Sequence, residues 1–140
     1  MRKTITAVAA LGLLLMTGCS DDESGDNSAQ ACEDFARSQR ELTNSLRDGR
    51  LDLNIHEVEA KRSAAVDSMD AAGLSTSNPD IKDRITDLVE SAPTKTTELL
   101  LSKSQAEDFN RATESVARAC ASAGSVIIVN KIPIVRYMGP

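Results

Sequence analysis

Large apolar side chains are scarce in this chain and recur with the spacing of α-helices. Between residues 20 and 125, 19 of 106 residues are Leu, Ile, Val, Phe or Met, and a further 15 are Ala. This apolar content is close to the level below which chains remain disordered, so a fold must bury most of its large side chains. We expect a first helix that Ser28 caps and that Gly49 ends. Its buried face comprises Cys32, Phe35, Ala36, Leu42 and Leu46.

The second and third helices are marked by capping residues at their starts. Asn54, with Glu57 three positions later, is similar to a capping box, and Gly73 is expected to end the second helix. Asn78 followed by Pro79 is a cap with proline at the first helical position, which is typical of helix starts. The buried face of the second helix is expected to comprise Ile55, Val58, Ala65, Val66 and Met69, with Arg62 near its edge, and that of the third helix Ile81, Ile85, Leu88 and Val89.

Pro93 is expected to break or kink the chain after the third helix, because proline lacks an N–H and crowds the preceding turn. Residues 94–103 then allow either a short separate helix or an extension of the third helix beyond the kink. A capping box at Ser104 and Glu107 is expected to begin the last helix, and Gly124 to end it. The apolar stripe of this helix comprises Phe109, Ala112, Thr113, Val116, Ala117, Cys120 and Ala123.

The first 18 residues have the organisation of a secretory leader. Arg2 and Lys3 precede an apolar run, Ile5–Met16, that is shorter than the roughly 20 residues a membrane-spanning helix needs. Small residues then lead to a cysteine in Leu15-Met16-Thr17-Gly18-Cys19, and here the chain resembles the bacterial lipoprotein family. The resemblance implies cleavage between Gly18 and Cys19 and a diacylglyceryl group on the Cys19 sulfur. The alternative is an ordinary secretory signal in which Cys19 is incidental.

The same resemblance implies a location for the rest of the chain. Residues 1–18 would be a removable signal peptide, and acylated Cys19 would anchor the mature chain to the bacterial cell membrane, outside the cytoplasm. Several acyl chains on one residue, such as palmitate, anchor a protein stably, whereas a single chain is marginal. Residues 19–28 carry four acids and no large aliphatic or aromatic side chain, so we expect a flexible acidic tether there.

Cys32 and Cys120 are expected to form a disulfide. With Cys19 assigned to the lipid, they are the remaining cysteines of an exported chain, where thiols are usually oxidised. They lie near the start of the first helix and near the end of the last, and these ends meet in an up-down bundle with an even number of helices. Closing a loop of 88 residues corresponds to about 4.5 kcal/mol of stabilisation. The alternative is two buried, unpaired thiols.

These features predict an all-α protein: a small up-down four-helix bundle over residues 29–124, closed by one disulfide and followed by a β-prone tail over residues 125–140. β-branched residues dominate from Val126 to Val135, a run too short and too polar in its middle to span a membrane. Two placements of the tail remain open. It either lies back over the bundle and adds apolar core, or forms an exposed strand that joins a partner's sheet. Candidate partner-binding residues are Val126, Ile128, Ile132 and Ile134.

Composition and motifs argue against nucleic-acid binding and against catalysis. The net charge is −5 and the aromatic residues are two Phe and one Tyr, whereas nucleic-acid binding needs basic stripes and stacking rings. The single histidine, His56, has neither a second histidine nor a spare cysteine with which to complete a zinc site. Neither a serine-nucleophile motif nor a glycine-rich phosphate loop occurs. We expect His56 to face solvent, and we expect no catalytic residue, no metal site and no cofactor.

The function that we expect is that of a small envelope lipoprotein whose helical ectodomain binds a protein partner at the membrane surface. The layout is similar to that of some phage- and plasmid-encoded lipoproteins that block superinfection or protect against toxins. Without Arg2 and Lys3 the chain has 14 basic and 21 acidic residues, which weakly favours basic partners. One alternative is a carrier that holds a small apolar ligand or a lipid between its helices, and another is an enzyme that uses His56.

Overall fold

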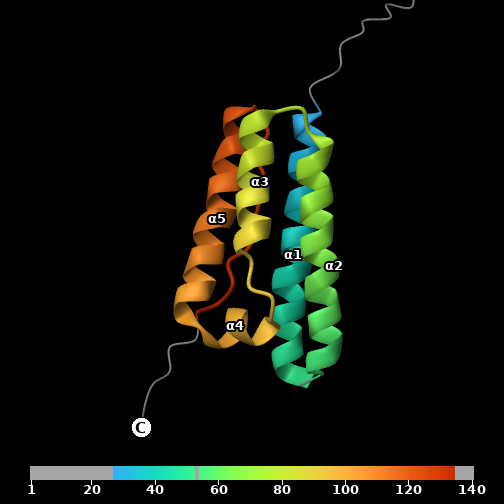
Figure 1. Cartoon of the computed structure of the whole chain (residues 1–140), viewed down its shortest axis with the longest axis vertical. Coiled ribbons are helices and arrows are strands. Elements are labelled where there is room, and N and C mark those ends of the chain that lie inside the picture. The colour runs from blue at the N-terminus through green and yellow to red at the C-terminus, as the bar shows by residue number, and fades with distance from the viewer. Residues whose placement is uncertain (1–26, 53, 135–140) are drawn as a thin grey trace, which may run out of the picture.

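A computed structural model describes residues 27–52 and 54–134, which form five helices. The four long helices run alternately up and down and pack side by side, and a short helix lies across one end of them (Figure 1). This arrangement confirms the predicted all-α bundle. The helices are α1 (Ser28–Asp52), α2 (Ile55–Ser75), α3 (Pro79–Ser91), α4 (Thr96–Leu101) and α5 (Lys103–Ser122).

Three of the predicted helix boundaries are confirmed by their caps. The Asn54 side chain accepts a hydrogen bond from the Glu57 N–H at the start of α2. Asn78 accepts from the first free N–H groups of α3, at 3.1 and 3.2 Å, and Pro79 occupies the first helical position. Gly124, just beyond the end of α5, has a φ of 88°, a conformation that a side chain disfavours.

Two glycines do not end helices as predicted. Gly49 lies inside α1, which continues to Asp52; a glycine in a helix costs about 1 kcal/mol, which neighbouring helical hydrogen bonds can offset. Gly73 lies inside α2 and is buried against α3, where a Cβ atom would lie 2.8 Å from Cγ2 of Ile85. Gly73 is therefore needed for the close approach of two helices, and the chain leaves α2 two residues later.

The start of the last helix is also corrected. Its cap is Ser102 rather than Ser104, because the Ser102 hydroxyl accepts a hydrogen bond from the Gln105 N–H. The N–H of Ser102 donates to the carbonyl of Glu98 and thereby ends α4. Ser102 therefore ends α4 and begins α5. Residues 94–103 thus contain a short separate helix, which is one of the two alternatives that the sequence left open.

A polar cluster fixes the turn between α3 and α4 onto α2. Arg62 donates two hydrogen bonds to one carboxylate oxygen of Glu59, at 3.0 and 2.6 Å, and a third to the carbonyl of Pro93. The other carboxylate oxygen of Glu59 accepts the Thr96 N–H at 2.8 Å. Hydrogen bonding from Thr96, and next from Arg62, lowers the pKa of Glu59 to about 2. The carboxylate therefore stabilises the fold in its charged form.

Replacing Glu59 by glutamine is expected to destabilise the protein at neutral pH and not in strong acid. Because the folded-state pKa lies below the ordinary 4.5, the stabilisation is complete above pH 4.5 and disappears as the pH falls towards 2. The Glu59 side chain is 39 % exposed, so screening by water limits the loss at pH 7 to about 1 kcal/mol. Urea unfolding of both proteins at pH 7 and at pH 2.5 measures the difference. If the free energies of unfolding of the two proteins differ by the same amount at pH 7 and at pH 2.5, the stabilisation cannot come from the charged Glu59 carboxylate.

The core is held at one end of the bundle by the predicted disulfide. Cys32 in α1 and Cys120 in α5 are bonded, with their Cα atoms 5.9 Å apart, and both residues are fully buried. From this end the core continues along the bundle, with buried apolar residues from every helix. The largest of these fully buried side chains are Phe35, Leu42, Leu46, Met69, Ile81, Ile85, Leu88, Leu99, Val116 and, from beyond the helices, Ile132.

Candidate protein-interaction surface

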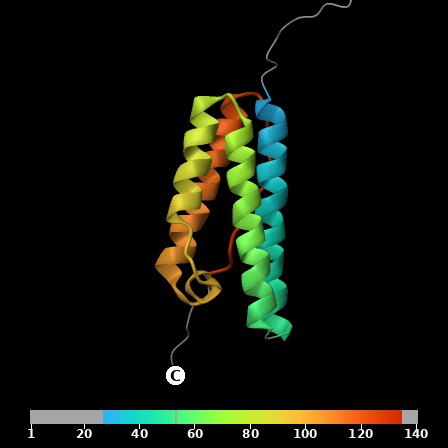
Figure 2. The ribbon, with the colours of Figure 1, turned by 45° about the vertical axis from the view of Figure 1, so that its right-hand side comes forward.

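The chain turns back at Gly124 and runs along the bundle, next to α1 and α5 (Figures 1 and 2). We call residues 125–134 the tail segment. Ile132 is 1 % exposed and belongs to the core, and Ile127 and Val129 pack against that core half-buried. Of the two placements that the sequence left open, the one in which the tail lies back over the bundle is therefore confirmed for these residues.

Side-chain carboxamides hold the main chain of the tail segment. Gln39 of α1 donates to the carbonyl of Asn130 and accepts its N–H at 2.9 Å. Asn110 of α5 does the same for Ile132, at 3.0 and 2.8 Å. Gln39 and Asn110 thus provide the pair of hydrogen bonds that a residue of a neighbouring strand would provide. Residues 27–52 and 54–134 contain no strand, and the predicted β-like tail is a segment without regular secondary structure that is hydrogen-bonded to helices.

Two basic side chains also fix the tail segment. Arg40 of α1 donates to the carbonyl of Ile128 at 2.7 Å. The ammonium of Lys131 lies 2.7 Å from a carboxylate oxygen of Glu114 on α5, and its hydrogen bond and charge lower the pKa of that carboxyl. The segment is therefore fastened to α1 at its beginning and to α5 further along.

The four predicted partner-binding residues have different environments. Val126 and Ile128 are 86 % and 74 % exposed, the highest values among the large hydrophobic residues that the structure describes. Ile134 is 37 % exposed, at the end of the described chain. Ile132 was a wrong choice, because its side chain fills the core and is not available to a partner. We call the exposed pair, Val126 and Ile128, the tail face.

Gln39 and Asn110 were not singled out from the sequence, although a signal for both exists. Each lies on the apolar stripe of its helix, with Ala36 and Leu42 near the first and Phe109 and Thr113 near the second. A polar side chain at a core position needs a hydrogen-bond partner, because leaving it unpaired is costly. The sequence therefore predicts that each of these side chains has a hydrogen-bond partner, but it does not identify the main-chain segment that provides it.

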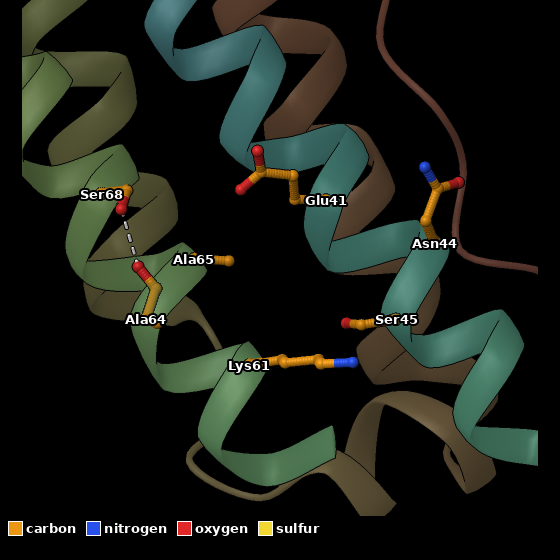
Figure 3. A pocket seen from close by; sticks show the side chains of 7 residues that line it. All are labelled: Glu41, Asn44, Ser45, Lys61, Ala64, Ala65 and Ser68. Atoms are coloured by element: carbon orange, nitrogen blue, oxygen red, sulfur yellow. Dashed lines mark hydrogen bonds between the residues drawn. The ribbon is translucent and has the colours of Figure 1, made fainter. Parts of the chain in front are cut away.

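The hollow between α1 and α2 does not provide the lining that an apolar ligand needs. It has a volume of about 430 Å³ and is open to solvent (Figure 3). Glu41 and Ser45 of α1 and Lys61 of α2 point into it, and Ser68 bonds its hydroxyl to the carbonyl of Ala64. Pockets for apolar ligands are lined mainly by hydrophobic and aromatic side chains. This hollow therefore does not support the carrier hypothesis.

His56 is exposed in the first turn of α2. Within the two described ranges, no three His, Cys, Asp or Glu residues are grouped so as to hold a metal ion. In the same part of the chain, no helix has the length and the apolar content required to cross a bilayer. Gly18 and Cys19, the predicted cleavage and lipidation residues, lie outside the described residues.

Comparison of the chain with protein-family models, with curated proteins and with solved structures finds no match.

Proposed function

We propose that this chain is a lipid-anchored envelope protein whose helical ectodomain binds a protein partner through the tail face. The anchor is supported by the order of features at the N-terminus, from Arg2 and Lys3 through the apolar run to Gly18 and Cys19. A disulfide between Cys32 and Cys120 agrees with a chain that matures outside the cytoplasm. The proposed location is the outer side of the bacterial cell membrane, with acylated Cys19 in the bilayer.

The observation that carries the interaction proposal is the tail face itself. Val126 and Ile128 are strongly exposed although the main chain next to them is fixed by Arg40 and Gln39. Apolar side chains on a rigid support lose little conformational entropy on binding, so they suit a partner's surface. If no partner covered them, exposed apolar residues in such a segment would favour aggregation.

The proposal for the tail face is tested with the double variant Val126→Ser, Ile128→Ser. Affinity capture from cross-linked membranes, with the native anchor retained, should lose a partner that the unchanged protein enriches. Because both side chains are exposed, the free energy of unfolding should change by less than about 0.5 kcal/mol. Leu74→Ser, Leu101→Ser is the matched control, since these leucines are also exposed but lie on α2 and α4. If the two double variants enrich the same amount of the partner, the proposal for the tail face is contradicted.

The lipid anchor is tested separately by mass spectrometry of the mature N-terminus. Cys19→Ser should abolish acylation and leave the precursor uncut, so the variant should keep residues 1–18 and lack the mass of the acyl chains that form the proposed anchor. An unmodified N-terminus in the unchanged protein, or cleavage after Gly18 that persists in the variant, would refute the anchor without affecting the tail face.

A further inference from the structure

We propose that the groove between α1 and α2 binds a basic segment of a partner protein, with an Arg or Lys side chain placed on the Glu41 carboxylate. This inference goes beyond the proposed function, because the groove is a second surface, separate from the tail face. Glu41 follows Gln39 by two positions, which is about 200° around the helix. It therefore lies on the side of α1 opposite to the carboxamide that holds the tail segment.

The groove consists of two adjoining hollows along the same pair of helices. The hollow described above has a volume of about 430 Å³, and a second one of about 420 Å³ continues it towards the start of α1 and the end of α2. Glu41 of α1 and Ser68 of α2 line both hollows, so they mark the place where the two meet. Apart from Lys61, α2 contributes only alanine and serine to the walls, so a bound segment can come close to this helix.

The charges of the groove leave one carboxylate unpaired. Lys61 lies 3.0 Å from Glu57, and Arg37 lies 2.8 Å from Asp34, so each of these pairs is neutral. Within the part of the chain that the structure describes, Glu41 has no ion-pair or hydrogen-bond partner. Its side chain points into the groove (Figure 3). The two neutral pairs and Glu41 together carry one negative charge, at the junction of the hollows, which favours a cation.

The serines of the groove present hydrogen-bond acceptors to a ligand. Each hydroxyl donates its hydrogen to a main-chain carbonyl of its own helix, which leaves the lone pairs of the oxygen available. These serines are Ser38, Ser45, Ser68 and Ser75, with donor–acceptor distances of 3.0, 2.8, 2.8 and 2.8 Å. An anion would have to break these bonds to obtain a donor, whereas an ammonium or guanidinium group brings its own. The hydroxyls thus favour the same sign of ligand as Glu41.

The length of the groove fits a peptide segment better than a small cation. From Asp34 to Ser45 its α1 wall extends over about 17 Å, since each helical residue advances the helix by about 1.5 Å. About five extended residues or three helical turns would fill both hollows, whereas a small cation would occupy only their junction. Packing of the segment against the alanines of α2 adds to an ion pair that contributes little by itself at an exposed position.

The test is an NMR titration of the full chain with a nine-residue peptide of alanine and serine that has one central arginine and blocked ends. The amides of Ala65 and Ser68 should shift and saturate at millimolar peptide. A control peptide with citrulline in place of arginine keeps the shape and loses the charge, and it should bind about two- to fivefold more weakly, the range for one exposed ion pair.

Protein variants test the role of Glu41 directly. Glu41→Gln should weaken binding of the arginine peptide by the same factor, about two- to fivefold, and should not change binding of the citrulline peptide. Glu90→Gln is the matched control, because Glu90 is an exposed glutamate of α3 without a partner in the described part of the chain. This control should not change the affinity. Both glutamates are exposed, so the melting temperatures of the two variants should equal that of the unchanged protein.

Three results would overturn the inference. The first is the absence of saturable shifts in the groove with the arginine peptide, and the second is equal affinity for the arginine and citrulline peptides. The third is equal weakening by Glu41→Gln and Glu90→Gln, which would reduce the effect to the overall charge of the protein. The variant Val126→Ser, Ile128→Ser should bind the arginine peptide normally, so failure of the groove and failure of the tail face are distinguishable.

Discussion

Replacing Cys32 and Cys120 together by alanine is expected to lower the free energy of unfolding by about 4.5 kcal/mol. The bond closes a loop of 88 residues, so its removal increases the conformational entropy of most of the unfolded chain. Domains of this size have only about 5–15 kcal/mol of stability in total, and this core contains few large side chains. Alanine is chosen because both positions are fully buried, where a serine hydroxyl would need a partner.

Thermal unfolding followed by circular dichroism measures this effect. At about 4–8 °C per kcal/mol, a loss of about 4.5 kcal/mol should lower the melting temperature by roughly 18–36 °C. Adding a reductant to the unchanged protein should produce a similar loss, whereas the double variant should not respond to reductant. A variant that melts within a few degrees of the unchanged protein would show that the packed helices, and not the bond, determine stability.

The pairing of these cysteines could be predicted because two arguments agree: thiols of an exported chain are usually oxidised, and the topology brings the two residues together. An even number of alternating helices brings the first start and the last end together, wherever the intermediate boundaries lie. Those boundaries were less predictable where glycine was used to locate them. Gly124 ends its helix with a positive φ, but Gly73 is required for contact with Ile85, and sequence does not separate these two roles.

The position of the tail could not be predicted from local pattern. β-branched residues favour an extended conformation, and residues 125–134 form no helix, but the partners of their main chain lie far away along the sequence. Gln39 and Asn130 are 91 positions apart, and Asn110 and Ile132 are 22 apart. A carboxamide on a helix can replace the edge of a neighbouring strand, so the same tail sequence is compatible with a sheet or with this bundle. Only the packed structure decides between them.

Ile132→Ala is expected to destabilise the protein by about 2–4 kcal/mol, the usual cost of removing a large aliphatic side chain from a core. Ile132 is 1 % exposed and its N–H and carbonyl are both bonded to Asn110, so little rearrangement can fill the space. Ile128→Ala is the matched control: the same residue type, four positions away and 74 % exposed, with an expected effect below about 0.5 kcal/mol. Urea unfolding of the three proteins measures the difference.

Hydrogen exchange then distinguishes detachment of the tail from a simple loss of core packing. If Ile132 anchors the tail segment, the amide of Asn130 should exchange faster in Ile132→Ala than the amides at the centre of α5, because the segment can open without unfolding the bundle. In Ile128→Ala its exchange should not change. An effect below about 0.5 kcal/mol for both substitutions would mean that the tail segment adds nothing to the core, and the tail face would then lack the rigid support on which its proposed binding role depends.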